Sequence, residues 1–233
     1  FATSPSFVKA ICNRKVAVNR EKVHYWPQYA EDFYQPVDKN TAKEAAVAYG
    51  IPNDDSFKIV FTGNIGTAQG IDILPQTAEL LKNENIKLVI IGDGRYLEKL
   101  VSDIKSRQLE KMFIFVARQP AEKIPVLLSA CDVAFISFAD DELWKMTIPA
   151  KLQSYMACGM PVLAVADGET KRIIDESECG VCIENRDPVK LKEVIYLLTK
   201  RDLTEYENKS RIYFIDNYEK RKILNDMEKY LNR

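Results

Sequence analysis

The sequence of 233 residues is informative first for what it lacks. It has a single histidine, His24, which excludes sites built from several histidine ligands and leaves few candidates for a histidine base. It has almost no net charge, because 33 basic residues stand against 34 acidic ones, so a whole-molecule electrostatic basis for binding nucleic acid is absent and only a local basic patch stays open. No apolar run approaches the roughly 20 residues that span a bilayer. What is present, 46% hydrophobic and 29% charged residues, is an ordinary globular composition.

The start of the chain, F-A-T-S-P-S-F-V-K-A-I, lacks the basic end, apolar centre and cleavage site of a signal peptide. It is typical of a chain entered partway, with Ser4 or Ser6 capping a first helix. Five cysteines, an odd number without a secretory signal, predict reduced thiols in a cytosol. Cys179 and Cys182 form a C-x-x-C, but the motif contains Gly180 and continues into an apolar segment. We therefore predict small core residues rather than a zinc or redox site.

Short apolar runs alternate with helical segments along most of the chain. Continuous apolar runs are typical of strands covered on both faces. The alternation predicts an α/β fold with a doubly wound, mostly parallel, Rossmann-like sheet, followed by C-terminal helices. The predicted strands are 57–62, 87–91, 112–116, 133–137, 161–165 and 180–183, and the predicted helices are 70–81, 96–107, 121–130, 149–158, 169–176, 188–199 and two more within 203–231. The first 56 residues fit this pattern poorly, with a helix, an extended V-H-Y-W-P and a second helix at T-A-K-E-A-A-V-A-Y.

Ligands of open α/β sheets bind beyond the carboxyl ends of the strands, where helix N-termini present unpaired N–H groups. G-N-I-G-T-A-Q-G at 63–70 follows the first core strand, and its glycines allow backbone to approach a ligand. It matches neither the dinucleotide fingerprint nor the P-loop, so anion binding and a plain tight turn both stay open. I-G-D-G-R at 91–95 follows the second strand and favours a simple turn slightly.

A third stretch, T-I-P-A-K-L-Q-S-Y-M-A-C-G-M-P at 147–161, has clear helix signals at both ends. We expect Thr147 to cap the helix, Pro149 to occupy its first turn and Gly159 to end it in the left-handed conformation. Lys151 would add a full charge to the helix dipole, on a polar side shared with Ser154. The opposite, buried stripe would be Ile148, Leu152, Tyr155 and Met156. With the glycine turn, this predicts a diphosphate clamp; a well-capped surface helix is the alternative.

These stretches resemble the donor-binding domain of the family-four retaining glycosyltransferases, which have the GT-B fold. The resemblance rests on T-I-P-A-K-L-Q-S-Y-M-A-C-G-M-P-V-L-A, then D-G-E-T-K-R-I-I, and later E-C-G-V, in that order. The turn G-N-I-G-x-x-Q-G, in place of the commoner G-R-x-x-x-x-K-G, is similar to a subgroup of bacterial surface-polysaccharide assembly. That subgroup adds fucosamine-like or related sugars to lipid-linked acceptors. F-A-T-S-P-S-F and V-H-Y-W-P-Q-Y-A-E-D-F-Y-Q-P resemble the inter-domain connection of such enzymes.

The resemblance implies that these residues are the C-terminal half of an enzyme whose acceptor-binding domain comes first. It divides the chain into an inter-domain connection with the first helix at 1–40, a nucleotide-sugar-binding Rossmann-like domain at 41–215, and a C-terminal helix at 216–233 that packs toward the absent domain. Such a half is expected to bind donor and to transfer nothing alone. The implied partners are the nucleotide-sugar donor and that N-terminal domain, with no nucleic acid and only indirect membrane contact through a lipid-linked acceptor. The implied location is cytoplasmic, extending to a peripheral position at the inner face of the membrane.

The resemblance also implies donor contacts. Backbone N–H groups of residues 63–66 would hold the diphosphate, and Arg118 would lie near the nucleotide base. Thr147, Ile148 and Pro149 would shape the sugar and phosphate end. The full set of expected donor-binding residues is Gly63, Asn64, Ile65, Gly66, Gln69, Gly92, Arg118, Lys145, Thr147, Ile148, Pro149, Lys151 and Ser154. The catalytic residues are expected in the absent domain.

Two departures from the family pattern affect these expectations. Asn64 and Gln69 stand where family members often carry a phosphate-binding arginine and lysine. Positive charge would then come from Lys151, Lys145 or Arg118, or from the helix dipole alone.

The second departure concerns the family's paired glutamates, eight positions apart, which fall on Met146 and Ser154. The ribose-binding carboxylate is therefore missing at position 154, where serine offers only a shorter hydroxyl. Glu142 or Glu169 could substitute for it.

The implied reaction moves a sugar from a nucleotide diphosphate sugar, with UDP favoured, to an acceptor hydroxyl with retention of configuration. Its transition state is oxocarbenium-like, and the charge that the departing diphosphate gains would be stabilised by a helix N-terminus, turn amides and a lysine. No metal or other cofactor is required, and the acidic pair Asp140 and Asp141 is interpreted as solvated loop charges.

Three alternatives stay open. A nucleotide-sugar epimerase-like enzyme could use the same architecture but would need acid and base residues in the cleft. A response-regulator or flavodoxin-type module would be about half this length, and a regulator would carry acidic strand ends. A degenerate, non-catalytic nucleotide-binding module is compatible with Asn64, Gln69 and Ser154.

Overall fold

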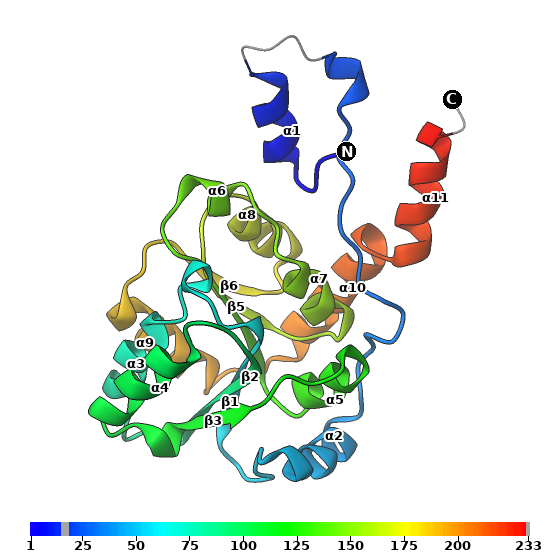
Figure 1. Cartoon of the computed structure of the whole chain (residues 1–233). Helices are drawn as coiled ribbons and strands as arrows, with labels where there is room; N and C mark the ends of the chain where they lie inside the picture. Colours follow the sequence, from blue (N-terminus) through cyan, green and yellow to red (C-terminus); the bar gives the residue numbers. More distant parts are fainter. Residues whose placement is uncertain (15–18, 232–233) are drawn as a thin grey trace.

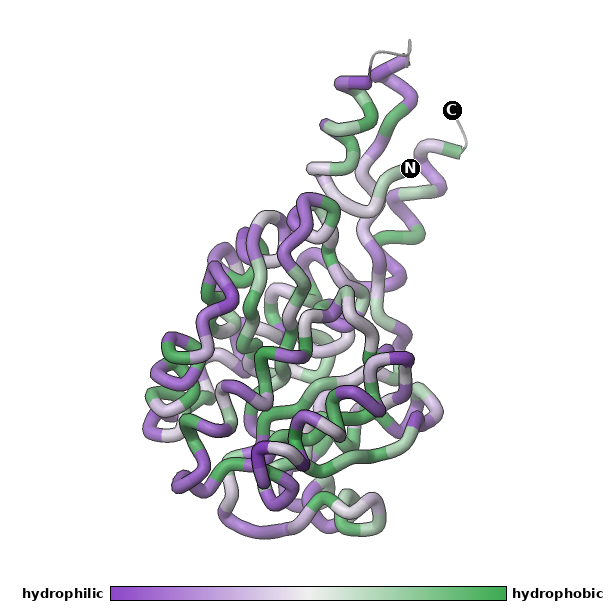
Figure 2. The backbone as a smooth tube through the Cα atoms, turned by 60° about the vertical axis from the view of Figure 1, so that its left-hand side comes forward, coloured by the Kyte–Doolittle hydropathy of each residue, from purple (hydrophilic) through white to green (hydrophobic). Residues whose placement is uncertain are grey.

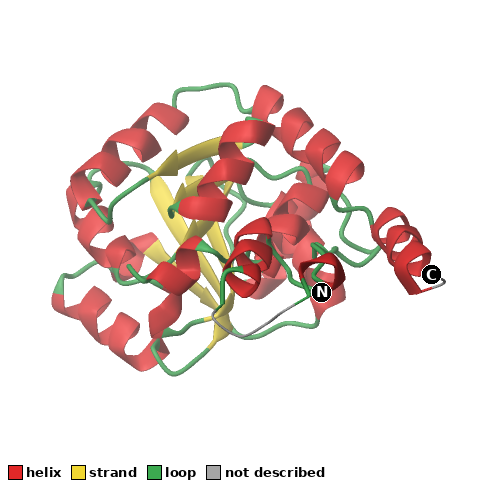
Figure 3. Ribbon diagram, turned by 90° about the horizontal axis from the view of Figure 1, so that it is seen from above, coloured by secondary structure: helices red, strands yellow, loops and turns green. Residues whose placement is uncertain are grey.

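The centre of the protein is a six-stranded parallel sheet, seen edge-on among the helices in Figure 3. The computed structural model describes residues 1–14 and 19–231. The strands are β1 (Phe57–Asn64), β2 (Ile86–Asp93), β3 (Phe113–Val116), β4 (Val133–Ser137), β5 (Val162–Val165) and β6 (Gly180–Ile183). Their order is β3-β2-β1-β4-β5-β6, which confirms the doubly wound, Rossmann-like sheet.

Helices cover both faces of the sheet, as the sequence pattern predicts. On one face lie α3 (Ile73–Leu80), α4 (Leu97–Ser106) and α9 (Pro188–Leu198). On the other lie α2 (Lys39–Ala46), α5 (Ile124–Ser129), α7 (Ala150–Ala157), α8 (Gly168–Ser177) and α10 (Thr204–Asn217). The chain is completed by α1 (Pro5–Cys12), the short α6 (Glu142–Lys145) and α11 (Lys220–Leu231), with 3-10 turns at 20–22, 47–49, 67–69, 110–112 and 121–123. None of these described helices is both long and apolar enough to cross a membrane.

Alternate residues of the strands face two separate apolar cores. In β1, Val60 faces the core under α5 and α7, whereas Ile59 and Phe61 face the core under α3 and α4. The backbone coloured by hydropathy shows apolar segments running through the middle of the molecule (Figure 2). Burial on both faces explains why the strands are continuous apolar runs.

The predicted boundaries differ from the observed ones mainly at turns. β1 and β2 run into their glycine turns, because Gly63 and Asn64 stay in register with Gly92 and Asp93. The predicted helix 70–81 begins later, after a separate 3-10 turn, and the predicted helix 121–130 starts as a 3-10 turn before α5. The helix α6 was not expected at all, since E-L-W-K is too short to show a period.

Two helix ends, the start of α1 and the end of α7, follow the sequence prediction. Ser4 caps α1 by accepting a hydrogen bond from the Phe7 N–H at 3.1 Å. Gly159 takes a left-handed conformation, with φ of 66°, directly after α7. The stripe predicted to be buried on that helix is buried, with Tyr155 and Met156 at 0% exposure.

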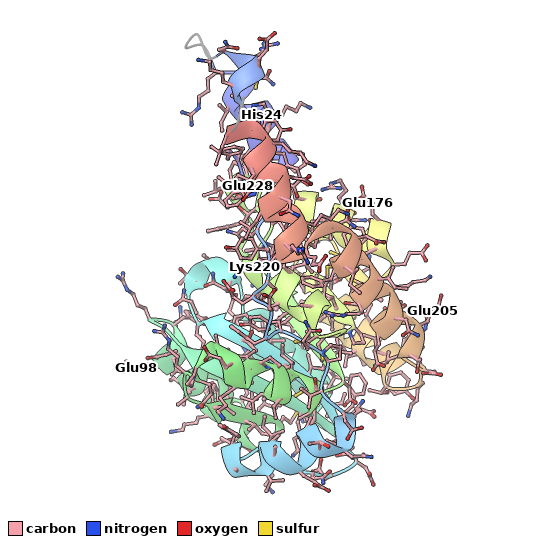
Figure 4. All side chains as sticks on the ribbon, turned by 90° about the vertical axis from the view of Figure 1, so that its right-hand side faces the viewer. His24, Glu98, Glu176, Glu205, Lys220 and Glu228 are labelled. Atoms are coloured by element: carbon pink, nitrogen blue, oxygen red, sulfur yellow. The ribbon has the colours of Figure 1, made fainter. Side chains whose placement is uncertain are left out.

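The N-terminal segment and α11 extend together from one end of the molecule (Figure 1). An isolated bridge joins Ala2 to Tyr25, and the His24 and Tyr230 rings lie 4.3 Å apart between centroids. Figure 4 shows His24 beside α11. Residues 15–18 and 232–233 of the predicted segments 1–40 and 216–233 lie outside the described part of the chain.

Candidate functional site: a cleft where the sheet divides

The sheet divides at its carboxyl edge between β1 and β4. These strands pair only through Ile59 and Val60 with Val133 and Ala134. Further along β1, the Thr62 N–H donates to the Tyr155 hydroxyl at 2.9 Å. A helix side chain thus takes the place of the neighbouring strand, and a crevice opens at the point where the strand order reverses, which is where ligands of such sheets bind.

An open cleft of about 1120 Å³ occupies this edge. Its walls come from the glycine turn after β1, the end of β2, the loops after β3 and β4, the start of α7 and the segment before α2. The lining residues are Tyr34, Thr62, Gly63, Asn64, Gln69, Ile91, Gly92, Asp93, Gly94, Arg118, Gln119, Pro120, Ala121, Ile124, Phe138, Trp144, Thr147, Pro149, Ala150, Lys151 and Ser154.

Most of the residues expected to bind donor lie together in this cleft, and four do not line it. Ile65 and Ile148 are core residues, with 0% and 4% exposure. Gly66 belongs to the turn behind Asn64, and Lys145 lines a separate, smaller hollow of about 270 Å³. Lys145 is also engaged in an ion pair with Glu142 at 2.6 Å.

The backbone N–H groups of the glycine turn are not all available, contrary to expectation. The Ile65 N–H donates to the Asp93 carbonyl at 2.8 Å, and the Gly66 N–H donates to Gln69 Oε1 at 3.1 Å. The pairing of β1 with β2 occupies the first, and a side chain that folds back onto the turn occupies the second. The expectation that residues 63–66 offer these two amides to a diphosphate is therefore wrong.

The N-terminus of α7 differs from the prediction in its cap. The helix begins at Ala150 after an extended Pro149, and no side chain caps it. Thr147 instead donates its hydroxyl to the Leu143 carbonyl at 2.8 Å, because the unpredicted α6 places it at the end of that preceding turn. The first amides of α7, at Ala150 and Lys151, thus have no acceptor in the described part of the chain and lie at the cleft.

Lys151 projects from α7 across the end of β1. Its ammonium nitrogen lies 3.6 Å from the centroid of the Phe61 ring, a cation–π contact. A methyl group placed on Gly63 would lie 3.6 Å from the same nitrogen, so the lysine reaches the glycine turn. Burial lowers the pKa of Lys151 to about 7. Lys151 is therefore partly enclosed rather than on an open polar face, and an anion in the cleft would favour its charged form.

The remaining charges of the cleft are few. Arg118, on the loop after β3, is the other cation that lines it, and Asp93 is the one carboxylate among the lining residues. The Asp93 carboxylate accepts a hydrogen bond from the Gly94 N–H at 2.7 Å. The cleft can therefore hold an anion near Lys151 with little competing negative charge.

Neither glutamate proposed to replace the missing carboxylate lies in the cleft. Glu169 is 4% exposed, pairs with Arg172 and accepts a hydrogen bond from the Ser6 N–H at 2.7 Å. Glu142 is exposed and pairs with Lys145. That part of the prediction is wrong, because both carboxylates serve contacts outside the cleft.

Three aromatic residues of the cleft were missed by sequence reasoning. Tyr34 comes from the segment before α2 and lies beside Ser154; burial raises the pKa of Tyr34, and the Ser154 side chain partly offsets that rise. Phe138 and Trp144 stack with ring centroids 5.5 Å apart and planes 2° apart. Tyr34 carries no local signal, whereas F-A-D-D-E-L-W, directly after a strand, could have indicated an aromatic wall.

The cysteines follow the sequence interpretation in part. Cys179 is buried, Cys182 is half-buried in β6, and neither is in a disulfide. Burial raises the pKa of Cys179 to about 11 and that of Cys182 to about 12, which is typical of unreactive thiols. Within residues 1–14 and 19–231, no three His, Cys, Asp or Glu side chains are grouped as metal ligands.

The comparisons with known proteins agree with this fold. The sequence pattern of the family "Glycosyl transferases group 1" matches residues 43–222. The chain is 32% identical over 163 residues to the probable glycosyltransferase WbjE of Pseudomonas aeruginosa, an alignment that covers 68% of this chain and 40% of WbjE. Among solved structures, Anabaena HepE in complex with UDP-glucose superposes with a TM-score of 0.85 at 15% identity, covering 99% of this chain and 62% of HepE. A glycosyltransferase of Rickettsia africae superposes with a TM-score of 0.81 at 16% identity, covering 98% and 61%.

The parallel Rossmann-like sheet, the cleft at the point where its strand order reverses and the sequence match together define the class of this protein. The chain belongs to the group 1 glycosyltransferase family. It spans between about two fifths and three fifths of the length of these relatives.

Proposed function

We propose that this chain is the donor-binding half of a retaining glycosyltransferase that uses a UDP-sugar. The observation that carries the proposal is the meeting of the Lys151 ammonium and the uncapped amides of α7 at the divided edge of the sheet. A diphosphate bound there would contact a helix N-terminus and a cation at once. The UDP-glucose complex of HepE supports uridine as the base.

The same groups suit the chemistry of the transfer. As the glycosidic bond breaks, the diphosphate gains negative charge, and fixed donors that face the place where charge develops stabilise the transition state. Asn64 and Gln69 carry no charge, so the cation beside Gly63 at the start of the turn is Lys151. In this proposal no metal is needed, and the leaving diphosphate acts as the base toward the acceptor hydroxyl, with configuration retained.

The rest of the enzyme is also part of the proposal. The chain spans 62% of HepE and 40% of WbjE, which supports an acceptor-binding domain that precedes these residues in the intact enzyme. We place the acceptor, a lipid-linked sugar or polysaccharide of surface assembly in the fucosamine-transferase-like subgroup, on that domain. The enzyme would work in the cytoplasm at the inner face of the membrane, and this half alone would transfer no sugar.

Calorimetric titration with UDP, GDP and ADP tests the donor site. We expect UDP to bind most tightly, and Lys151→Met to weaken UDP binding about ten- to hundredfold, because one charge-assisted contact is worth roughly 1.5–3 kcal/mol. Lys99→Met is the matched control: Lys99 also lies over an aromatic ring, with its ammonium 5.5 Å from the Tyr96 centroid, but outside the cleft. That variant should bind UDP like the wild type.

The other outcomes separate the alternatives. Failure of the wild-type chain to bind any nucleotide would contradict the donor site and favour the degenerate module. Equal binding of UDP by wild type and Lys151→Met would move the phosphate contact elsewhere in the cleft. Interconversion of a UDP-sugar with its epimer would favour the alternative function, a nucleotide-sugar epimerase.

A further inference from the structure

Three loops at the carboxyl edge of the sheet meet at Arg186, which lies on the loop after β6. One guanidinium nitrogen of Arg186 donates to the Gly70 carbonyl at 2.9 Å and to the Phe138 carbonyl at 2.8 Å. A second nitrogen pairs with Asp72 Oδ1 at 2.7 Å. Arg186 therefore joins the end of the glycine turn to the loop after β4, although it does not line the donor cleft itself.

The two joined loops lie side by side, and both line the cleft. Gln69, one residue before Gly70, lines it from the turn, and Phe138 lines it from the other loop. Gly70 allows the close approach: a methyl group there would lie 2.0 Å from the guanidinium and 2.6 Å from the Phe138 carbonyl oxygen. The Ser137 hydroxyl adds a bond to the Gln69 carbonyl at 2.6 Å.

The hydrogen bonds of Arg186 with the two carbonyls contribute more to holding the loops together than its ion pair with Asp72. The Asp72 side chain is 45% exposed, so its pairing with Arg186 is largely screened by solvent and contributes little by itself. The Arg186 side chain is only 23% exposed, and its hydrogen bonds reach main-chain groups of two separate loops. Removing the guanidinium would leave both carbonyls without that donor.

Through its stack on Trp144, Phe138 links the Arg186 contacts to a side chain that lines the cleft. Trp144 lies on the short α6 and lines the cleft beside Thr147 and the start of α7. Fixing the Phe138 main chain therefore fixes the plane on which Trp144 rests. A small shift of this wall would change the space next to the glycine turn.

We infer that Arg186 is a positioning residue of the donor cleft, which holds the Phe138–Trp144 wall at a set distance from the glycine turn. This inference rests on the proposed function for its ligand, a nucleoside diphosphate. Arg186 contacts neither the ligand nor the reacting atoms in this account. It acts through the Gly70 and Phe138 carbonyls.

Trp144 provides a direct optical test of the wall. The chain has two tryptophans, so Trp26→Phe leaves Trp144 as the single reporter. In that background, we expect Arg186→Ala to raise the acrylamide quenching constant of Trp144 about twofold, because the loosened wall admits solvent. Asp72→Asn, which keeps both carbonyl contacts, should leave quenching near the starting value. Unchanged quenching in Arg186→Ala would overturn the inference whatever the ligand proves to be.

UDP titration of the same variants tests the consequence for the ligand. We expect Arg186→Ala to weaken UDP binding about tenfold. Arg186→Lys retains a charged donor, so its affinity for UDP should lie between those of Arg186→Ala and the wild type. Arg107→Ala is the matched control for loss of an ion-paired arginine: Arg107 is 30% exposed and pairs with Glu79 at 2.5 Å and Asp103 at 2.8 Å, away from the cleft. It should lower the melting temperature without changing UDP affinity.

The outcomes distinguish this inference from the proposed function. Absence of UDP binding in the wild-type chain would contradict the proposed function. Binding by the wild type that Arg186→Ala retains in full would overturn the positioning role alone. If Arg186→Ala does not fold, Arg186→Lys with its circular dichroism intact decides the same question.

Discussion

A buried lysine ammonium without a carboxylate partner holds its proton weakly, and Lys151 is in that position among residues 1–14 and 19–231. Desolvation is the cause of its low pKa. Neither the Phe61 ring nor the start of α7 carries a negative charge that would raise the pKa of Lys151 again. A bound diphosphate would supply it, so ligand charge and the protonation of Lys151 are coupled in the proposed site.

This coupling predicts that UDP binding weakens with rising pH. The free protein has a pKa of about 7 at Lys151, and a phosphate nearby raises that pKa in the complex, so binding takes up a proton once the pH exceeds about 7. We expect the dissociation constant for UDP to rise about fivefold between pH 7 and pH 8. Calorimetry in buffers of different ionisation enthalpy measures the proton uptake directly.

Lys151→Met is the reference for that measurement, since it keeps an apolar chain on Phe61 and has no proton to gain. Its affinity should depend on pH only through the nucleotide. The free energy of unfolding should also depend on pH. The pKa of Lys151 is lower in the folded than in the unfolded chain, so the unfolded chain binds more protons above about pH 7. The wild type is therefore expected to gain stability as the pH rises from about 7 toward the ordinary pKa of lysine. A wild-type pH profile identical to that of Lys151→Met would contradict the coupling.

At the scale of the element, α7 both shapes and holds open the divided edge of the sheet. Its side chain Tyr155 is fully buried and accepts the Thr62 N–H, while the Thr62 hydroxyl lies 3.1 Å away. Burial raises the pKa of Tyr155 far above its ordinary value, so the phenol stays neutral. The hydroxyl satisfies a strand amide that has left its neighbour β4, which is what permits the crevice.

Tyr155→Phe should therefore destabilise the fold by about 1–3 kcal/mol, because it removes the acceptor of a buried N–H and leaves the shape otherwise unchanged. Urea unfolding measures the difference. Tyr213→Phe is the control: its hydroxyl contacts Glu176 at 3.2 Å on an exposed pair, and we expect a change within about 0.5 kcal/mol. An equal loss of unfolding free energy in both variants would contradict a specific contribution of the Tyr155–Thr62 hydrogen bond.

The elements also show which parts of the site the sequence could predict. The period of Leu152, Tyr155 and Met156 and the left-handed Gly159 defined α7 from local signals alone. The prediction that Thr147 caps α7 was wrong because the preceding helix α6 has a single turn, which is too short to show a period. A short helix depends on tertiary contacts, which local patterns do not contain.

Longer-range parts of the cleft were beyond local reasoning for the same reason. Tyr34 reaches Ser154 from a segment far away in sequence, and nothing in Y-A-E-D-F-Y-Q-P marks one tyrosine over another. The occupied amides of Ile65 and Gly66 depend on the register of β1 with β2 and on the conformation of one glutamine side chain. The glycine spacing predicted the turn but not which of its donors are free.

At the scale of the whole molecule, the N-terminal segment is tied to the loop that leads into α7. The Ser4 hydroxyl donates to the Met146 carbonyl at 2.6 Å, and the Thr170 hydroxyl donates to the Thr147 carbonyl at 3.1 Å. These bonds hold Met146 and the adjacent cleft residue Thr147, from the cap of α1 on one side and from α8 on the other. The predicted division at residues 40 and 215 stays a prediction, but the first segment directly contacts the loop that leads into α7.

Glu169 is the second tie, and it joins α1 to α8. Its carboxylate accepts the Ser6 N–H in the first turn of α1, and Arg172 donates to its other oxygen at 2.8 Å. Hydrogen bonds from Ser6 and Arg172 overcome burial and lower the pKa of Glu169. Its contribution to stability is therefore present above the ordinary glutamate pKa and is lost as pH falls through the lowered folded value.

Glu169→Gln should release α1 while the sheet stays folded. A neutral amide is a weaker acceptor for the helix N-terminus, so we expect hydrogen exchange of the amides in 5–12 to speed up about tenfold, equivalent to roughly 1.4 kcal/mol of local stability. Glu176→Gln is the matched control, because Glu176 also pairs with Arg172, at 2.7 Å, but is 48% exposed and contacts Tyr213 of α10. Exchange in β1 and β4 should be unchanged in both variants. Faster exchange of α1 in Glu176→Gln as well would assign the effect to Arg172, and equal protection in Glu169→Gln would show that Ser4 alone holds the segment to the cleft wall.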